Sequence, residues 1–480
     1  MKTQKNNVKT ENEKWYDHFT EKKSSKISAE KSKRKEFNKS RDKYFDEKRR
    51  GIDKKNKILE TEKNSFKSEN SKKIDAKIEK QSNMFDFFKL PKDALNVLEN
   101  FDQIVQGIRP LNSKQVQNLP KDIKTLSHQL TDERETRRAG YMNANHELSA
   151  YVRYFAWWNL VRLTRVFANL PASAFHLNDN DVLLDIGSGP FTVVIALWLS
   201  RPELRNKKLT VYAMDISQST MSLGEDLYLS VAAKTPPSNK NAESHWNIIR
   251  VKGGIGTPLR KKVNFITCAN MFNELYQKEH ESPEAIANRQ IQNLLSYADT
   301  RCSFFIAEPG MPVAGRFISL MRERFIKNHN LIIAPCPHHE KCAMDGNHAR
   351  YGGSAKWCNF SFSTENAPKK LLKLSEQAGL PKERAVISFI FASSKTDGTK
   401  NNFNEESLKT SDSNITVISD PIWLPEHKAG FYSCSEKGMI LLINSTGKNV
   451  KSGEKIKMSM LKNIDILEKD KKSGAIKINV

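Results

Sequence analysis

The chain has 480 residues and carries 78 Lys and Arg against 55 Asp and Glu, a formal net charge of +23. It is too long for one ordinary domain, and no apolar run reaches the roughly 18 residues of a membrane-spanning helix, so we expect a soluble protein of two or three units. Six cysteines are too few for a disulfide-stapled scaffold. The basic balance indicates a polyanionic partner, either nucleic acid or an anionic membrane surface.

The basic charge is concentrated at the N-terminus. Residues 1–80 hold 26 Lys and Arg and 15 Asp and Glu, so nearly half of the net charge lies in a sixth of the chain. Few apolar residues accompany it, which predicts a basic low-complexity arm over 1–83, disordered or loosely helical. The arm is either a solvated extension or a tether that contacts RNA phosphates. Early acidic residues argue against a targeting signal, and we expect a cytoplasmic protein.

A helical domain is predicted over 84–171. Residues 93–102 have helical spacing, and aromatic and aliphatic residues recur at three- and four-residue steps from Leu148 to Leu170. The aromatic side chains of this long helix are candidates for stacking on bases, but their periodicity favours a buried face. Pro171 follows the apolar run and is expected to end the helix.

A nucleotide-binding turn follows. Residues 181–190 read as a buried strand running into a glycine turn, and residues 191–199 as an apolar helix. Gly187 and Gly189 let the backbone turn tightly and approach a ligand. A second strand, 209–215, ends in Asp215, whose carboxylate is suited to a ribose diol. This order predicts a doubly wound α/β domain over 172–393.

The details of the turn favour S-adenosylmethionine over NAD. The sequence Leu-Asp-Ile-Gly-Ser-Gly resembles the first motif of Rossmann-like class I methyltransferases, whereas the dinucleotide motif would need Gly at Thr192. We expect Asp185 to face the methionine ammonium or the loop backbone and Asp215 to face the ribose. The predicted cofactor-binding residues are Asp185, Gly187, Ser188, Gly189, Pro190 and Asp215.

Two further strands are expected to end in polar residues. They cover 263–270 and 302–310, and a third strand, 384–392, is expected at the sheet edge. Ligands collect at strand carboxyl ends, so Asn270, Asn273, Glu274 and Glu308 are expected near substrate or cofactor. Methyl transfer needs mainly alignment of the reacting groups, and a base only for a protonated acceptor. Asn273 and Glu274 are therefore only weak catalytic candidates.

The cysteines suggest a metal-held loop over 334–362. Cys336, Cys342 and Cys358 lie in a Pro-, Gly- and His-rich stretch without helical periodicity, and Cys434 follows at a distance. His338, His339 and His348 make zinc a competitor of an iron–sulfur cluster, and local chemistry leaves the two open. Cys268 and Cys302 lie in apolar strands and read as buried thiols.

Three segments together resemble a known family. Residues 130–134 with the 151–158 helix, Leu184 to Pro190, and the Cys-Pro-His…Cys…Trp-Cys-Asn-Phe-Ser element between 336 and 361 are similar to the methyltransferase-like small-ribosomal-subunit assembly proteins of bacteria and mitochondria. The resemblance covers about residues 90–445. It implies S-adenosylmethionine binding, a [4Fe–4S] cluster and association with the small ribosomal subunit and its rRNA. We also expect a monomer and no membrane partner.

Carried onto this sequence, the resemblance assigns the cluster to Cys336, Cys342, Cys358 and Cys434. Where the family usually has another Gly after Gly-Pro, this chain has Phe191, which is expected to narrow the cofactor site. The resemblance leaves rRNA methylation open. The alternative is a catalytically inactive RNA-binding assembly factor with a structural or sensing cluster, iron–sulfur or zinc.

The C-terminal part is predicted to be a small β unit. Residues 394–414 read as a polar linker, and short β patterns separated by glycine turns cover 415–480. This unit either contacts RNA or covers the cluster.

Overall fold

A computed structural model of the chain describes residues 78–131, 144–175, 177–275, 281–347, 356–394, 412–444, 450–459 and 468–480. The predicted arm up to residue 77, most of the predicted linker and His348 lie outside these residues. The chain divides into a unit ending at Lys73 and a unit from Ile74 to Val480, and only the second is described. None of its described helices is long and apolar enough to cross a membrane.

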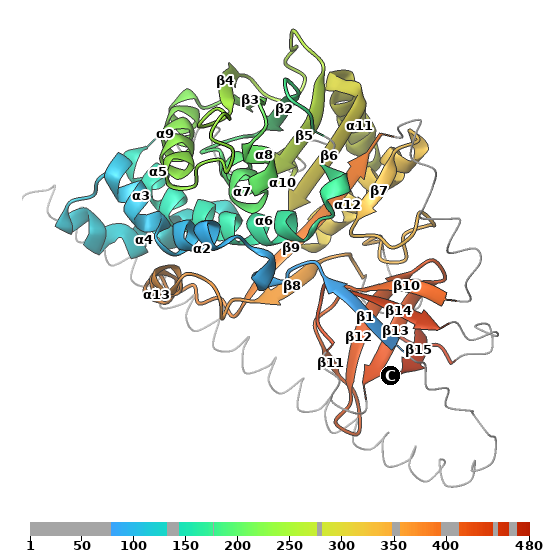
Figure 1. Ribbon diagram of the computed structural model, residues 1–480. Helices are drawn as coiled ribbons and strands as arrows, with labels where there is room; N and C mark the ends of the chain where they lie inside the picture. The colour runs from blue at the N-terminus through green and yellow to red at the C-terminus, as the bar shows by residue number, and fades with distance from the viewer. Residues whose placement is uncertain are drawn as a thin grey trace, which may run out of the picture. The chain divides into compact units, whose positions relative to one another are not determined.

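An eight-stranded sheet organises the second unit (Figure 1). Its order is β4-β3-β2-β5-β6-β9-β7, with β8 paired to β9. Strands β2 to β6 run parallel, whereas β9 is antiparallel to both β6 and β7. The strands are β2 (Val182–Ile186), β3 (Thr210–Asp215), β4 (Asn247–Lys252), β5 (Val263–Ala269), β6 (Ala298–Glu308), β7 (Leu331–Ala334), β8 (Phe360–Ser363) and β9 (Arg384–Ser393). This is the Rossmann-like fold of class I methyltransferases, as the sequence predicts.

Strand β9 corrects one expectation. It was expected at the sheet edge, yet it lies between β6 and β7 and also pairs with β8. Its residues Ala385 to Ser393 are buried except at Val386. Such a strand, covered on both faces, gives a nearly continuous apolar run, and that run does not tell an interior position from an edge.

Helices cover both faces of the sheet. Alternate residues of β6 fall into different core clusters, with Phe305 in one and Phe304 in the other, because neighbouring side chains of a strand point to opposite faces. The helices of the first cluster include α6 (Trp157–Asn169), α7 (Thr192–Ser200) and α9 (Gln218–Lys234). Those of the second are α11 (Pro283–Tyr297), α12 (Pro312–Lys327) and the short helix α10 (Phe272–Leu275). The short helix α8 (Pro202–Arg205) contributes Leu204 to the first cluster.

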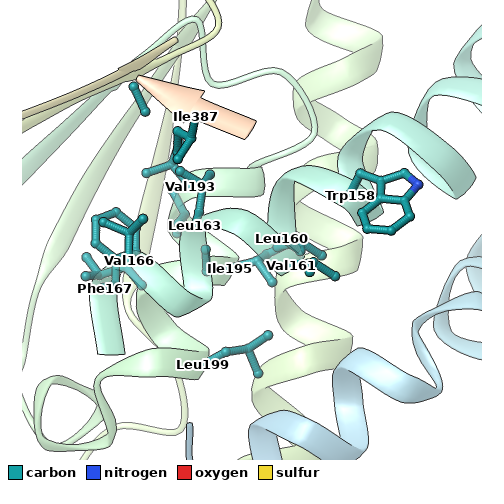
Figure 2. Close-up of a cluster of buried hydrophobic side chains, with 14 of the residues drawn as sticks. Trp158, Leu160, Val161, Leu163, Val166, Phe167, Val193, Ile195, Leu199 and Ile387 are labelled. Carbon is teal, nitrogen blue, oxygen red and sulfur yellow. The ribbon is translucent and has the colours of Figure 1, made fainter. Parts of the chain in front are cut away.

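The predicted helical domain shares its core with the sheet. It comprises η1 (Phe87–Lys89), α2 (Lys92–Glu99), α3 (Phe101–Ile108), α4 (Ser113–Thr131), α5 (Asn145–Ala150), η3 (Tyr151–Ala156), α6 and η4 (Ala172–Ala174). Figure 2 shows residues of α6 packed with residues of α7 and with Ile387 of β9. The aromatic periodicity from 148 to 170 therefore mostly marks a core face, and Trp157 and Trp158 are each 1% exposed.

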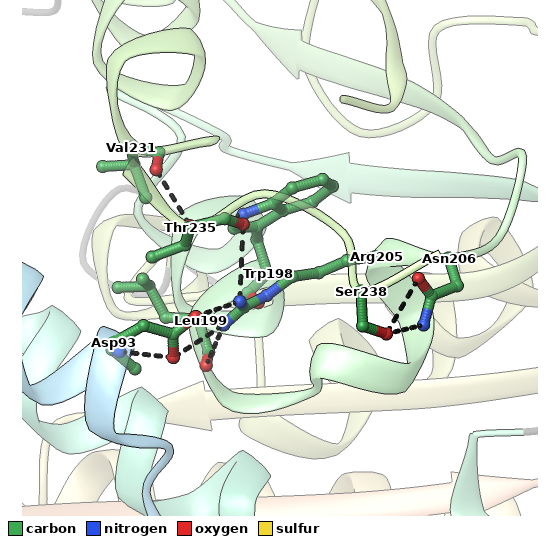
Figure 3. A network of polar contacts seen from close by, with 9 residues as sticks. Asp93, Trp198, Leu199, Arg205, Asn206, Val231, Thr235 and Ser238 are labelled. Atoms are coloured by element: carbon green, nitrogen blue, oxygen red, sulfur yellow. Dashed lines mark hydrogen bonds and ion pairs between the residues drawn. The ribbon is translucent and has the colours of Figure 1, made fainter. Parts of the chain in front are cut away.

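An arginine joins the first helices to the sheet. Arg205 is 2% exposed and forms an ion pair with Asp93 of α2 (Figure 3). Its guanidinium also donates to the carbonyls of Trp198 and Leu199, at 2.7 and 3.0 Å. A buried charge is stable only when its hydrogen bonds are satisfied, so this network fixes where α2 packs.

The second sheet unites the two ends of the described chain. It has the order β1-β14-β10-β12-β13-β15, with β11 paired to β12. Its strands are β1 (Ile78–Asn83), β10 (Asp412–Val417), β11 (Ile422–Trp423), β12 (Ala429–Ser435), β13 (Gly438–Asn444), β14 (Glu454–Ser459) and β15 (Ile476–Asn479). Strand β1, blue in Figure 1, pairs antiparallel with β14, so the last six residues of the expected arm are a strand of the C-terminal β unit.

Phe85 fixes the chain that leaves β1. It is 4% exposed and lies near the rings of Phe360, Phe362 and Phe389. A Cβ atom on Gly453 would come within 2.5 Å of the Phe85 ring, so the turn before β14 is shaped around this side chain. Phe85 thus links the two sheets.

We expect the Phe85→Ala variant to lose about 3–5 kcal/mol of unfolding free energy, because a buried aromatic side chain leaves a cavity among three rings. Phe88→Ala is the matched control, since Phe88 is 87% exposed and its removal is expected to change stability by about 0.5 kcal/mol or less. Urea denaturation followed by fluorescence measures both. Equal stability of the two variants would contradict this packing.

Candidate functional site

The glycine turn lies at the carboxyl end of β2. Gly187, Gly189 and Phe191 have φ angles of +70°, +50° and +57°, so the chain passes through the left-handed region before entering α7. Glycine adopts this region without strain, whereas a residue such as phenylalanine does so only when packing compensates. A Cβ atom on Gly189 would meet no atom nearer than 4.0 Å, whereas one on Gly187 would lie 2.7 Å from the Met271 side chain, so space beside the turn is left only at Gly189.

Phe191 turns away from that space. Its side chain is fully buried in the core, and a Cβ atom on Gly224 of α9 would come within 2.7 Å of the Phe191 ring. The ring therefore fills a gap left by a glycine on the neighbouring helix. The sequence alone could not indicate this compensation, because Gly224 lies 33 residues further along the chain.

Asp185 is held inside the protein. Its two carboxylate oxygens accept hydrogen bonds from the hydroxyls of Ser188 and Thr267, both at 2.7 Å. Burial raises the pKa of Asp185 to about 7, and the nearby charge of Asp215 adds to this effect, whereas the two hydroxyls oppose it. A carboxyl group in this range is ionised most readily beside a positive charge, such as an ammonium or a sulfonium.

Asp215 closes the loop from the neighbouring strand. Its carboxylate accepts the backbone N–H of Gly189 at 2.9 Å and that of Ser217 at 2.8 Å. A carboxylate offers about four lone-pair positions, so acceptor capacity remains for a diol. Directly after it, Ile216 is 59% exposed and presents an apolar surface beside the carboxylate. The arrangement combines a glycine turn, a polar anchor and an apolar surface, which fits a nucleoside.

The polar residues after β5 and β6 form one network. Glu308 is 1% exposed and accepts the backbone N–H groups of Phe272 and Asn273, at 2.8 and 3.1 Å. It also accepts the side-chain amide of Asn273 at 2.9 Å. Burial raises the pKa of Glu308 to about 7. Glu308 therefore positions the segment that carries Asn273 and Glu274.

These residues line a cavity of about 190 Å³. Asn270, Asn273, Glu274 and Glu308 face it from the sheet, and residues of η3 and α6 enclose the other side. Asn270 has a φ of +57°, an uncommon conformation for a residue with a side chain. The sequence predicted the sheet side of this cavity, but not the helical side.

The four predicted metal ligands come from separate segments. Cys336 and Cys342 follow β7, Cys358 precedes β8, and Cys434 lies in β12. Burial raises the pKa of the Cys358 thiol well above its usual value, and Cys336, Cys342 and Cys434 raise it further. The four sulfur atoms thus lie within electrostatic reach of one another, and all six cysteines of the chain are free thiols.

Polar groups hold this thiol cluster in place. Arg322 donates to the Cys336 sulfur at 3.1 Å and to the carbonyls of His338 and Glu340 at 2.8 Å. The Nε2 atom of His338 lies 3.1 Å from the Cys434 sulfur, and Ser388 of β9 donates to the Cys358 carbonyl at 2.8 Å. Among the described residues, however, no group of three or more His, Cys, Asp or Glu side chains is arranged to hold a metal ion.

Of the histidines that favoured zinc, His339 is engaged elsewhere. Its Nε2 atom accepts the backbone N–H of Ile332 at 3.0 Å. Burial lowers the pKa of His338 to about 4, so its ring is neutral at physiological pH.

A comparison with protein families matches residues 178–402 to the family described as mitochondrial small ribosomal subunit Rsm22. The match spans the glycine turn, Asp215, strands β5 and β6, and three of the four predicted metal ligands, Cys336, Cys342 and Cys358. It confirms the resemblance predicted from the sequence. No curated protein matches the chain.

Solved methyltransferase structures show distant similarity. A putative RNA methyltransferase from Pyrococcus horikoshii has 12% identity and a TM-score of 0.26, covering 50% of this chain and 85% of its own. A methyltransferase from Geobacter sulfurreducens in complex with S-adenosyl-L-homocysteine has 10% identity and a TM-score of 0.28, covering 49% and 90%. A putative class I methyltransferase from Listeria monocytogenes has 10% identity and a TM-score of 0.28, covering 66% and 95%. TM-scores of this size support no argument, so the fold assignment rests on the strand order.

Proposed function

We propose that the chain, whose residues 178–402 match the family described as mitochondrial small ribosomal subunit Rsm22, binds S-adenosylmethionine and acts on the small ribosomal subunit, in its assembly or in translation. Cofactor binding is supported by the hydrogen bonds that join Asp185 and Asp215 to the glycine turn at the carboxyl ends of β2 and β3. The net charge of +23 suits an rRNA partner. Free thiols in such number suit a reducing compartment.

The cofactor supplies an electrophilic methyl group when it is bound. The protein then has to align an acceptor with that group and exclude water. Asp215 and Ile216 are placed to hold the nucleoside, and Asp185 to stabilise positive charge near the loop. Asn270 and Asn273 would position the acceptor, while Glu308 keeps their segment in place.

A second candidate is an assembly factor without turnover. It is favoured by the fact that both carboxylates already have donors within the protein, Asp185 from two hydroxyls and Asp215 from two backbone N–H groups. Such a loop keeps its shape without a cofactor. In this second candidate, the chain binds rRNA, and its cysteines hold a structural or sensing cluster.

We expect Asp215→Asn to weaken binding of S-adenosyl-L-homocysteine by about tenfold or more, since hydrogen bonds to a charged group contribute about 1.5–3 kcal/mol. Isothermal titration calorimetry measures the affinity. Asp226→Asn on the exposed side of α9 is the matched control and should bind as the wild type does. A wild-type chain that does not bind the ligand would exclude the cofactor site.

The ribosomal role is tested in cells. We expect ultraviolet crosslinks of the tagged full-length chain to map to small-subunit rRNA, and mapping of methylated nucleotides in wild-type and Asp185→Ala strains then separates the two candidates. Loss of one methylated nucleotide with crosslinks retained identifies an enzyme. Unchanged methylation identifies an assembly factor, and crosslinks confined to other RNAs would refute the ribosomal role.

We propose further that Cys336, Cys342, Cys358 and Cys434 hold a [4Fe–4S] cluster. Thiolates are the ligands of such clusters, and the cationic Arg322 beside Cys336 offsets the negative charge that they bring. The ligands of a single zinc ion must all lie about 2.0–2.3 Å from one centre. Each thiolate would bind a different iron of the cluster, so the four thiols would not have to surround one centre as the ligands of zinc do.

Anaerobically purified wild-type protein should be brown and contain about four irons per chain. Cys434→Ser should lose most of this iron, because the fourth ligand is missing. Cys302→Ser, which removes a buried strand thiol outside the cluster, should keep it. Stoichiometric zinc without iron in the wild type would refute the assignment, as would equal iron in both variants.

A further inference from the structure

The cavity beside Asn270 has a helical wall with an unusual backbone. Residues Tyr151–Ala156 form a π-helical turn between α5 and α6. Turns of this kind occur mostly as single insertions in α-helices and are frequent at functional sites. Two residues of the turn, Tyr151 and Phe155, line the cavity.

The two aromatic side chains present a flat surface. Their ring centroids are 5.9 Å apart and their planes differ by 23°, so the rings lie nearly parallel. Both are partly exposed, unlike Trp157 and Trp158 of the following turn, which are buried. Enzymes that act on bases stack the extruded base on aromatic side chains, and each such contact contributes about 1–3 kcal/mol.

Two amide side chains also line the cavity, Asn273 opposite the aromatic wall and Asn159 on the same wall. Asn273 uses its side-chain N–H for Glu308, and its carbonyl oxygen has no partner in the described part of the chain. The carbonyl of Asn159 accepts from Arg162 at 2.7 Å, and within the described ranges the Asn159 amide nitrogen donates to no protein group. The cavity therefore offers both a donor and an acceptor to the edge of a planar ring.

One cation lines this cavity, and a second lies near the first. Arg162 is part of the lining, as are the carboxylates of Glu274 and Glu308, whereas Lys382 lies outside the lining. Neither Arg162 nor Lys382 forms an ion pair with a carboxylate of the described residues. Burial and the positive charge of Arg162 lower the pKa of Lys382 to about 8, which shows that the two charges are close. The Lys382 ammonium lies 6.0 and 5.8 Å from the ring centroids of Tyr154 and Trp158. Like charges held together in a partly buried place favour an anion between them.

We propose that the cavity takes one nucleotide extruded from an RNA strand, with its base against Tyr151 and Phe155 and its phosphate on Arg162 and Lys382. The inference rests on the proposed function, because it makes this nucleotide the group that the chain presents to the cofactor. Asn270 lies at the end of β5, next in the sheet to β2 and its glycine turn. The base would therefore enter beside the cofactor loop.

Binding of 5′-AMP and 5′-CMP to the full-length chain, compared with adenosine and cytidine, tests the phosphate part. Saturation-transfer NMR titrations give the affinities. We expect the nucleotides to bind at least tenfold more tightly than the nucleosides, and Lys382→Gln and Arg162→Gln to remove this difference. Phe155→Ala should weaken nucleotides and nucleosides alike, since it removes part of the stacking surface.

Lys373→Gln, which changes an exposed lysine of α13 (Lys369–Gln377), is the matched control and should leave every affinity unchanged. Lys382 is partly exposed, so its variant remains informative if Arg162→Gln does not fold. Equal affinity of nucleotide and nucleoside in the wild type would overturn the proposal. So would a Lys382→Gln chain that keeps the wild-type difference.

Titration of S-adenosyl-L-homocysteine on the same samples separates this inference from the proposed function. If the wild type binds this ligand but shows no preference for nucleotides, only the nucleotide site is refuted. If the wild type binds nucleotides as expected but not S-adenosyl-L-homocysteine, the nucleotide site stands and the cofactor site is refuted.

Discussion

Backbone pairing of β9 is the constraint on which the rest of the second unit depends. This one strand bonds to β6 and β7 in the main sheet and to β8 at its first half. Ile387 and Val386 line the cavity, and Ser388 holds the carbonyl of Cys358. The cavity and the thiol cluster are therefore positioned by neighbouring residues of one strand. A shift of its register by one residue would turn each of these side chains to the opposite face.

The two candidate sites are held together by different means. The loop around Asp185 and Asp215 is fixed by short, local hydrogen bonds between adjacent parallel strands. The thiol cluster depends on contacts between the β unit and the main sheet, including Thr416 with the Pro335 carbonyl at 3.2 Å and an ion pair of Arg384 with Asp420 at 2.6 Å. Exposed ion pairs of the second kind stabilise little by themselves. Burial of Phe85 and Cys434 between the sheets is the stronger contribution.

Much of the fold could be predicted from local pattern. The strands β2, β3, β5 and β6 are short apolar runs that end in glycine or polar residues, and each was expected within a few residues of its observed bounds. Strand β1 could not be expected, because its residues Glu79 to Ser82 are exposed and their only reason to be extended is a partner near residue 454. The π-helical turn could not be predicted either, because residues 148–170 have the periodicity of one continuous helix. The cavity forms because Tyr151 and Phe155 lie opposite Asn270, which only the packing of α6 against the sheet decides.

The pairing of β1 with β14 also constrains the order of folding during translation. Lys80 of β1 bonds to Glu454 at the start of β14, 374 residues later. A ribosome adds about 5–20 residues per second, so β1 emerges roughly 20 to 75 seconds before its partner strand exists. During that interval it is an unpaired edge next to a strongly basic segment. The C-terminal sheet, which contains Cys434 in β12, is thus completed only when almost the whole chain has been made.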